Sequence, residues 1–593
     1  MKMEAPYQIP SRKRIPYGMM NFADVRESHC YFVDKTHFIP HIEAANKFFF
    51  FIRPRRFGKS LTLMMLQHYY DVLDKDHFEQ WFGDLYIGQH PTPERNSYLV
   101  ISLDFASINA ELNSYRASLD GYCRTMFSSF CRRYADYLPA GTWEELREIQ
   151  GAVGQLSFLH QRCAECGLSV YLFIDEYDHF TNKILSDSDC LNDYKSETHG
   201  TGYLRTFFDA IKTGTKGAIK RVFITGVSPV TMDDVTSGFN IGTNYSLSPE
   251  FNELTGFTEE EVRAMLAYYA EACAGTPSAF HHTTDQLIEK MKPWYDNYCF
   301  AKQSYGRIPM YNSTMVLYFL DNYIRNGGQL PDKMLEENIR VDYEKLRMLI
   351  RKDRAFAHDA SIIQTIVEQG YITGDLKTGF PAEKITNPDN FVSLLYYFGM
   401  LTIDGTSMGK TKLSVPNQVV REQMYNYLLD AYKENDLRYE RYTLGDLESK
   451  LAYLGDWQSY FDYIAHCIKT YSSQRDKQKG EYYVHGFTLA LTSLNPYYRP
   501  VSELDNQEGY ADIFLLPLLE IYKDMEHSYI IELKYAKSGD SAERVEALRQ
   551  KGITQANRYA DTEIVRRYIG HTQLHKIAVV FHGVDMAVCE EIK

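Results

Sequence analysis

The run from Phe48 to Leu63, FFFFIRPRRFGKSLTL, constrains the fold more than any other part of the chain. Phe48 to Ile52 is short and wholly apolar, which is typical of a strand buried on both faces of a sheet. The segment from Ser60 to Tyr70 has the apolar content of a helix packed on that strand. A buried strand joined to a helix by a short basic loop predicts an α/β domain.

Gly58, Lys59 and Ser60 end that loop in the manner of a phosphate-binding loop. In such a loop, backbone N–H groups and a helix N-terminus cradle phosphates, the lysine adds a point charge, and the serine hydroxyl ligates Mg²⁺. The pattern G-x-x-x-x-G-K-[ST] requires a glycine where Arg53 stands, so the tripeptide alone is equally compatible with chance. Its position between a strand and a helix favours a role in nucleotide binding. We expect ATP to contact Arg55, Arg56, Phe57, Gly58, Lys59, Ser60 and Leu61.

A partner motif, VYLFIDEYD, runs from Val170 to Asp178. Apolar residues followed by two carboxylates describe a buried parallel strand whose carboxyl end points into a crevice. With Ser60, Asp175 is predicted to hold Mg²⁺, while Glu176 polarises the attacking water, as phosphoryl transfer requires. The alternative is a strand that merely ends in solvated acids. The two motifs together favour ATP binding.

Further strands are predicted at Tyr98 to Phe105 and at Arg221 to Gly226, with helical segments between them. Strands that alternate with helices predict a doubly wound parallel sheet covered on both faces. Lys59, Ser60, Asp175 and Glu176 then meet in the crevice at the strand ends.

A second set of chemical residues lies in YIIELKY, from Tyr529 to Tyr535. Glu532 and Lys534 are two residues apart, so they project from the same face of a strand. Asp512, on a predicted neighbouring strand from Gly509 to Leu516, is expected beside them. Two carboxylates and a lysine can form a metal-dependent phosphodiesterase site, in which Asp512 and Glu532 bind Mg²⁺ and Lys534 orients the attacking water. The alternative is a surface strand that alternates Glu and Lys for ion pairing.

The chain resembles the AAA-ATPase-like proteins in which RPRRFGKS replaces the glycine-led loop. The resemblance extends over nearly the whole chain, and in this family Arg53 is a regular feature. Many members carry a C-terminal domain of the PD-(D/E)xK nuclease superfamily. The other matching segments are YFVDKTHFI (Tyr31 to Ile39), ITGVSPV (Ile224 to Val230), FNELTGFTEEEV (Phe251 to Val262), WYDNYCF (Trp294 to Phe300) and MYNSTMVLYFL (Met310 to Leu320).

This resemblance implies roles for further residues. Thr225 or Ser228 is a candidate sensor of the γ-phosphate, although Ser228 and Pro229 fit a simple turn equally well. Glu481, on an upstream helix, is a candidate third metal-binding carboxylate, with Glu503 and Glu508 as alternatives. Gln555 and Tyr559 match the Q-x-x-x-Y pattern that the nuclease superfamily often places beside its site.

The predicted fold is a multidomain α/β architecture in four parts. An AAA/ASCE-like P-loop domain occupies residues 1–257, with the YFVDKT stretch against it. A helical lid at 258–335 begins with a capping box from Thr258 to Glu261. A helical, winged-helix-like linker at 336–440 contains a hairpin-like stretch from Leu401 to Asn417. A PD-(D/E)xK restriction-endonuclease-like α/β domain occupies 441–593.

Composition indicates the cellular compartment and the kinds of partner that we expect for this chain. The net charge of −14 argues against indiscriminate coating of nucleic acid but permits a local basic groove. The first twenty residues show no signal peptide, and no apolar run approaches the length of a membrane span. Ten scattered cysteines suit a reducing cytoplasm, and the Cys163 and Cys166 pair is predicted to be packed thiols.

The sequence therefore predicts a cytoplasmic ATPase–nuclease fusion with ATP and Mg²⁺ as cofactors. ATP is expected to gate cleavage of nucleic acid, with DNA favoured over RNA, and analogy suggests defence against foreign DNA or mobile-element housekeeping. No membrane partner is expected, and assembly into homo-oligomers stays open. The rival interpretation is an ATP-switched signalling or interaction protein whose nuclease-like domain only binds nucleic acid or a partner.

Overall fold

The structure is a computed structural model that describes most of the chain in two compact units. The first unit comprises Met1–Ile339 and Thr373–Asn417, and the second comprises Arg340–Ile372 and Gln418–Lys593. The four domain boundaries that we expect from the sequence stay a prediction. The described residues are 12–108, 112–179, 202–230, 241–331, 334, 362–381, 384–385, 387–421, 423–424, 439–471, 481–492, 494–501, 513–519 and 522–593.

The first unit is built on a parallel sheet with the strand order β2-β3-β4-β1-β5. Every neighbouring pair is parallel, which confirms the doubly wound sheet. The loop strand β1 and the acidic strand β3 are separated only by β4, so their carboxyl ends lie close together. The strands are β1 (Phe48–Ile52), β2 (Leu99–Asp104), β3 (Val170–Asp175), β4 (Ile219–Gly226) and β5 (Thr243–Asn244).

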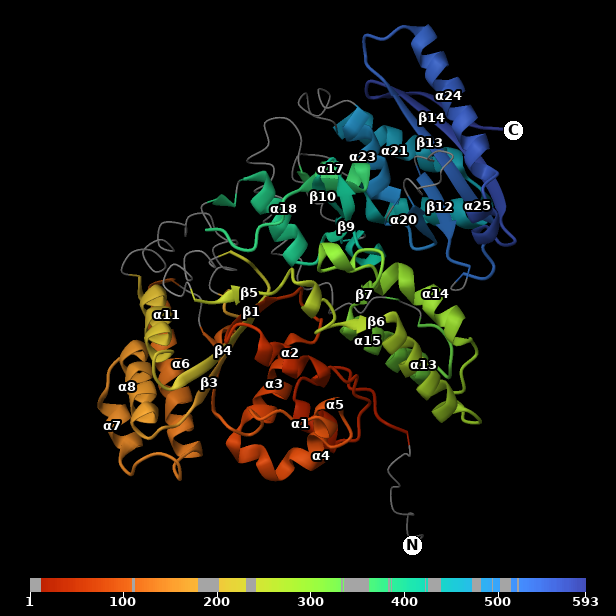
Figure 1. The fold of residues 1–593 in the computed structure, drawn as a ribbon. Helices are drawn as coiled ribbons and strands as arrows, with labels where there is room; N and C mark the ends of the chain where they lie inside the picture. Colours follow the sequence, from red (N-terminus) through yellow and green to blue (C-terminus); the bar gives the residue numbers. More distant parts are fainter. Residues whose placement is uncertain are drawn as a thin grey trace. The chain divides into compact units, whose positions relative to one another are not determined.

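Helices cover both faces of this sheet, as Figure 1 shows. Aromatic side chains on one face, including Phe49, Tyr171 and Phe223, share a core with Leu63 and Leu66 of helix α3. The helices on that side are α1 (Phe22–Glu27), α2 (Ile39–Ala44), α3 (Lys59–Tyr70), α4 (Phe78–Phe82) and α5 (Tyr86–Gln89). Those on the other side are α6 (Leu112–Arg133), α7 (Thr142–Glu148), α8 (Ala152–Glu165) and α11 (Tyr203–Gly214).

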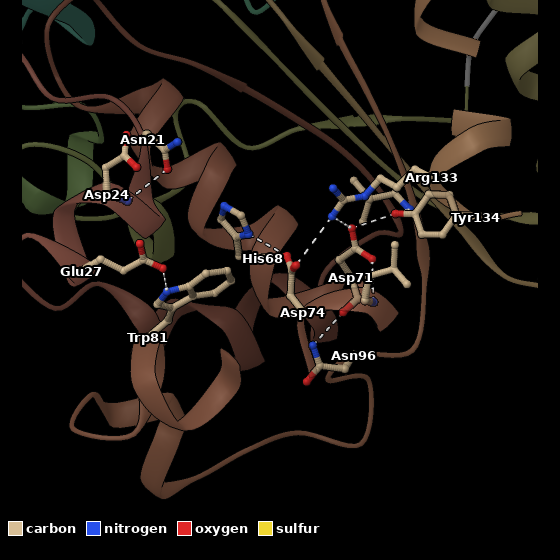
Figure 2. A network of polar contacts seen from close by, with 12 residues as sticks. Asn21, Asp24, Glu27, His68, Asp71, Asp74, Trp81, Asn96, Arg133 and Tyr134 are labelled. Atoms are coloured by element: carbon tan, nitrogen blue, oxygen red, sulfur yellow. Dashed lines mark hydrogen bonds and ion pairs between the residues drawn. The ribbon is translucent and has the colours of Figure 1, made fainter. Parts of the chain in front are cut away.

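A buried polar network holds the carboxyl end of α3 (Figure 2). Asp71, just after α3, accepts hydrogen bonds from the Arg133 guanidinium at 2.8 Å and from the Tyr134 hydroxyl at 2.7 Å. His68 on α3 contacts the Asp74 carboxylate at 2.6 Å. The helix that starts at the phosphate-binding loop is therefore fixed at its far end to the end of α6.

Three helices follow the sheet, in the region predicted as a lid. They are α13 (Glu259–Cys273), α14 (Thr284–Tyr295) and α15 (Ser313–Arg325). The predicted capping box is confirmed: the Thr258 hydroxyl accepts from the Glu261 N–H at 3.2 Å, and the Glu261 carboxylate accepts from the Thr258 N–H at 2.8 Å. Strands β6 (Phe257–Thr258) and β7 (Met310–Tyr311) pair at the base of these helices.

The first unit also contains the predicted hairpin. Strands β9 (Thr402–Ser407) and β10 (Lys410–Ser414) are antiparallel and follow helix α18 (Pro388–Tyr397). Strand β8 (Tyr371–Gly374) crosses the boundary between the two units in the sequence. The short 3-10 helices of this unit are at Thr36–Phe38, Val72–His77, Phe105–Ser107, Pro249–Phe251 and Lys302–Ser304.

The second unit has a mixed sheet with the order β11-β12-β13-β14-β15, in which only β13 and β14 are parallel. The two predicted chemical strands are neighbours, as expected, over their described residues. The strands are β11 (Tyr498–Val501), β12 (Ile513–Pro517), β13 (His527–Ala536), β14 (Gln573–His582) and β15 (Asp585–Glu591). The helices are α17 (Ile362–Gln369), α20 (Arg441–Leu454), α21 (Trp457–Tyr471), α23 (Glu481–Thr492), α24 (Ala542–Ala560) and α25 (Glu563–Tyr568).

Two expectations from composition can be compared with the structure. Within the described residues, none of the helices has the length and apolar character needed to cross a membrane. Cys163 is buried as predicted, but Cys166 is exposed. The packed-thiol prediction is wrong for Cys166 because α8 ends at Glu165 and leaves the next residue at the surface.

Glu448 on α20 makes the stability of the second unit depend on pH. Its side chain is buried, and burial raises its pKa to about 8. The positive charge of Arg441 lowers the pKa and so partly offsets this shift. The stabilising contribution of the neutral form is complete below the unfolded pKa near 4.5 and is lost as pH rises through 8. We expect Glu448→Gln to raise the free energy of unfolding by about 3 kcal/mol at pH 8.5 and to change it little at pH 4.5.

Urea unfolding between pH 4.5 and pH 9 checks this expectation. The matched control is Asp446→Asn, on the same helix, where the carboxylate is exposed and pairs with Lys450. Parallel pH profiles for the wild-type chain and Glu448→Gln would contradict the assignment of a protonated, buried Glu448.

Candidate functional site

The loop between β1 and α3 turns through two left-handed residues. Arg56 has φ 69° and Gly58 has φ 84°. Glycine adopts this conformation without a steric penalty, but an arginine does so only where its surroundings hold it. Gly58 is the N-cap of α3, so the backbone of the loop runs directly into the start of the helix. This is the geometry expected of an anion-binding loop.

Arg53, which stands in place of the usual glycine, is fully buried beneath the loop. Its guanidinium donates to the carbonyls of Ile52 at 3.0 Å, Ser246 at 2.6 Å and Phe251 at 2.9 Å. The rings of Phe51 and Phe300 each lie 4.2 Å from its central carbon. Burial lowers the pKa of Arg53 to about 10, so the group stays charged at neutral pH.

Ser60 and Asp175 meet where β1 and β3 end. The Ser60 hydroxyl donates to the Asp175 carboxylate at 2.8 Å. Lys59 is buried beside them, and its ammonium donates to the Pro54 carbonyl at 3.0 Å across the loop. Burial lowers the pKa of Lys59, and the carboxylates of Glu176 and Asp175 oppose that shift. Burial also raises the pKa of Asp175, while the bond from Ser60 lowers it.

A cavity of about 330 Å³ opens beside this cluster. Its size is that of a small-ligand pocket. The predicted nucleotide contacts from Arg55 to Leu61 line it, and Glu176 lines it as well. Asp175, also predicted to bind nucleotide through Mg²⁺, is not among the lining residues and reaches the loop through Ser60. The N-terminal segment contributes Tyr17, Tyr31 and Lys35, the start of α15 contributes Ser313 and Thr314, and Gly256 lies just before β6.

Lys35 ties two walls of this cavity together. Its buried ammonium forms an ion pair with Glu261 at 2.6 Å, so the YFVDKT stretch is joined to helix α13. Burial lowers the pKa of Lys35, and Glu261 raises it.

The second candidate site lies on β13 in the second unit. Glu532 is completely buried, and the Lys534 ammonium contacts its carboxylate at 2.9 Å. This confirms that the two side chains share a face of the strand. Helix α24 packs over that face, because a Cβ added at Gly552 would lie 3.7 Å from Glu532 and 3.8 Å from Lys534.

Two polar side chains of α24 add to this buried surface. Gln555 and Tyr559 follow Gly552 by about one and two helical turns. Within the described part of the chain, the Gln555 amide oxygen and the Tyr559 hydroxyl are buried without a hydrogen-bond partner. Buried polar atoms of this kind usually have a partner, such as a water molecule or a ligand.

Three predicted metal ligands of this site can be placed only in part. Asp512 lies outside the described residues, but the next residue, Ile513, pairs with Ile531, which precedes Glu532. Glu481 begins helix α23, and its side chain lies outside the description. Within the described residues, no group of three or more His, Cys, Asp or Glu side chains is arranged to hold a metal ion.

Comparison with known families matches one part of each unit. Residues 16–236 match the family model described as a predicted AAA-ATPase. Residues 479–591 match that of the PD-(D/E)XK nuclease superfamily. The chain joins an AAA-ATPase-like domain to a PD-(D/E)XK nuclease-like domain.

Individual relatives are more distant. An uncharacterized protein from the vnfD 5′ region of Azotobacter chroococcum mcd 1 is 27% identical over 263 residues. That match covers 43% of this chain and 45% of the relative, less than half of its length.

Two solved structures show only weak global similarity. Cdc6p from Pyrobaculum aerophilum has a TM-score of 0.27 at 12% identity and covers 72% of this chain and 97% of its own. The Aeropyrum pernix ORC2 protein has a TM-score of 0.28 at 10% identity, with coverages of 72% and 98%. The domain assignment therefore rests on the family models and on the two sheets.

The structure of the AAA-ATPase-like domain adds two residues that our sequence analysis did not single out. The Asp178 carboxylate is fully buried and accepts from the N–H groups of Val227 at 3.2 Å and Ser228 at 2.6 Å. The Tyr177 hydroxyl donates to the Ser228 carbonyl at 2.6 Å. In the sequence, the only sign of this role was that Asp178 is the third acidic residue after an apolar strand.

These contacts constrain Glu176, which has φ 49°. On one side its N–H donates to the Asp175 carboxylate at 2.9 Å, and on the other side Tyr177 and Asp178 are bound to the end of β4. A left-handed non-glycine residue held from both sides is typical of a functional position.

The sensor candidates differ in their contacts. The Ser228 hydroxyl accepts from the Val230 N–H at 3.1 Å, as expected of a turn residue. The Thr225 hydroxyl is buried and has no partner within the described residues.

We expect Arg53→Lys to destabilise the AAA-ATPase-like domain by about 3 kcal/mol. Lysine cannot bond the three carbonyls in one plane or stack on both phenylalanine rings. Urea unfolding measures the loss. The control is Arg132→Lys, at an exposed position on α6, which should change stability by less than about 0.5 kcal/mol. Equal stability of the two variants would show that the buried fork of Arg53 is dispensable.

Proposed function

We propose that the AAA-ATPase-like domain binds and hydrolyses ATP with Mg²⁺. We further propose that the nuclease-like domain is a Mg²⁺-dependent phosphodiesterase for nucleic acid, with DNA favoured, and that ATP gates this cleavage. The observation that carries the proposal is the pair of buried polar clusters, Ser60 with Asp175 and Glu532 with Lys534, each located in a domain of the corresponding family.

The residues around the cavity fit ATP and Mg²⁺. Oxygen ligands suit Mg²⁺, and the hydroxyl of Ser60, which lines the cavity, lies 2.8 Å from the Asp175 carboxylate. Cationic side chains of Arg55, Arg56 and Lys59 line the cavity and would neutralise phosphate charge. Bound Mg²⁺ would supply further charge neutralisation on the phosphates.

In this proposal Lys59 and Glu176 have defined roles. Lys59, now bonded to the Pro54 carbonyl, would turn to the β- and γ-phosphates. The charge of a bound phosphate would favour its protonated form, against the effect of burial. Glu176 would accept a hydrogen bond from the attacking water and orient it.

The nuclease-like site would work through Asp512, Glu532 and Lys534. Asp512 and Glu532, with Glu481 as a further candidate, would hold Mg²⁺ through carboxylate oxygens, as hard cations prefer. Lys534 would orient the attacking water. A fully buried carboxylate on a central strand requires compensation, and its lysine partner is an uncommon choice for a purely structural core.

The proposed setting is the cytoplasm, in defence against foreign DNA or in mobile-element housekeeping. We include self-association around bound nucleotide in the proposal. Light scattering with and without ATP tests this last part, and a single monomer mass under both conditions would exclude it.

For the ATPase, we expect Glu176→Gln to lower turnover by about 100-fold or more while ATP still binds, because the substitution removes the base and keeps the shape. Phosphate release measures turnover, and fluorescent ATP measures binding. Glu165→Gln, at the exposed end of α8, is the control and should behave as the wild-type chain. Unchanged turnover in Glu176→Gln would contradict the role of this residue.

For the nuclease, we expect the wild-type chain to cleave labelled DNA in the presence of Mg²⁺ and to lose this activity in EDTA. Glu532→Ala, Asp512→Ala and Lys534→Ala should each lower cleavage by about 100-fold or more. Single- and double-stranded DNA and RNA, each with and without ATP, identify the substrate and show whether ATP gates cleavage.

The control for Lys534→Ala is Lys537→Ala, an exposed lysine just beyond the same strand, which should retain full activity. Cleavage that persists in Lys534→Ala would point to a contaminating nuclease. ATP hydrolysis with no cleavage of any substrate would favour the ATP-switched interaction protein.

A further inference from the structure

Two successive carbonyls of the phosphate-binding loop are held by the start of α15 and by Gly256, which lies just before β6. The Arg56 carbonyl accepts from the Ser313 hydroxyl at 3.1 Å, the Thr314 hydroxyl at 3.0 Å and the Thr314 N–H at 3.3 Å. The next carbonyl, of Phe57, accepts from the Gly256 N–H at 2.9 Å. The conformation of the loop is therefore stabilised by residues that are distant from it in the sequence.

These contacts determine where the loop's N–H groups point. A trans peptide is planar, and its C=O and N–H point in opposite directions. With the carbonyls of Arg56 and Phe57 directed at the lid residues, the N–H groups of Phe57 and Gly58 point away from them. Neither N–H has a hydrogen-bond acceptor within the part of the chain that the structure describes.

The backbone angles agree with this orientation. Positive φ at Arg56 and Gly58 alternates with a negative φ at Phe57. Alternation of this kind turns successive N–H groups toward a common point and forms an anion-binding nest. A left-handed arginine is unfavourable by itself, so the three hydrogen bonds on its carbonyl stabilise this arrangement.

The lid residues also line the same cavity as the loop. Ser313 and Thr314 are the first two residues of α15, and both line the cavity together with Arg56, Phe57 and Gly58. An ideal Cβ at Gly58 would lie 3.6 Å from the Ser313 hydroxyl oxygen. The helix start and the loop are thus in direct contact.

We propose that Ser313 and Thr314 are positioning residues for nucleotide phosphates. They hold the Arg56 peptide so that the N–H groups of Phe57 and Gly58 are prepared to bind a phosphate. The inference rests on the proposed binding of ATP. It adds that phosphate affinity depends on the lid helix α15, which replaces the constraint that a first glycine would otherwise place on the loop.

The test compares ADP and adenosine binding to the full-length chain. We expect the double variant Ser313→Ala with Thr314→Val to bind fluorescent ADP at least ~10-fold more weakly than the wild-type chain. Binding of labelled adenosine, measured by equilibrium dialysis, should change less than twofold because adenosine has no phosphate. Replacing Thr314 with serine instead of valine (Thr314→Ser) keeps a hydroxyl at the same place, and this variant should bind ADP more tightly than the valine variant.

The matched control is Thr284→Val, at the first residue of α14, which should bind ADP as the wild-type chain does. Thermal unfolding checks that each variant is folded. If the double variant does not fold, the single variants Thr314→Val and Ser313→Ala are compared instead, and each should weaken ADP binding alone.

The outcomes separate this inference from the proposed function. Wild-type affinity for ADP in the double variant, or equal losses for ADP and adenosine, would overturn the inference and leave ATP binding in place. A wild-type chain that binds neither ATP nor ADP would overturn the proposed function and the inference with it.

Discussion

The buried guanidinium of Arg53 is the interaction on which the first unit's site depends. Removing a charge from water is costly unless other groups bind it, and here the two terminal nitrogens of the guanidinium donate to three carbonyls while two aromatic faces stack on it. Its Nε is buried without a hydrogen-bond partner among the described residues. The carbonyls belong to β1 and to the segment after β5, and Phe300 belongs to the region of the lid helices. One side chain therefore joins the strand before the phosphate-binding loop to the elements that surround it.

Around this anchor, the site keeps two non-glycine residues in the left-handed conformation. Arg56 is held by the start of α15, and Glu176 is held between Ser60-bonded Asp175 and the end of β4. In both cases contacts from distant parts of the sequence offset the unfavourable backbone. The loop and the acidic residue are thus held by contacts within the protein itself, and such preorganisation lowers the entropic cost of binding.

The nuclease-like domain also buries a charged side chain, but it compensates the charge with an ion pair. Glu532 has no exposure, and its charge is compensated by Lys534 two residues along the same strand. Helix α24 approaches this pair closely at Gly552, where any side chain would enter the contact with Glu532 and Lys534. The same helix carries Gln555 and Tyr559, whose buried polar atoms have no hydrogen-bond partner among the described residues.

The main secondary-structure elements and their local chemistry could be predicted from the amino-acid sequence. Apolar runs marked β1 and β3, the capping box marked α13, and the spacing of Glu532 and Lys534 placed both on one face, because these properties depend on neighbours within a few residues. The contacts of Arg53, Asp178, Ser313 and Thr314 became apparent only in the folded chain. Their partners lie about 50 to 260 residues away in the chain, and no local periodicity records such contacts. A buried arginine and a solvated one look alike in sequence, and only packing distinguishes them.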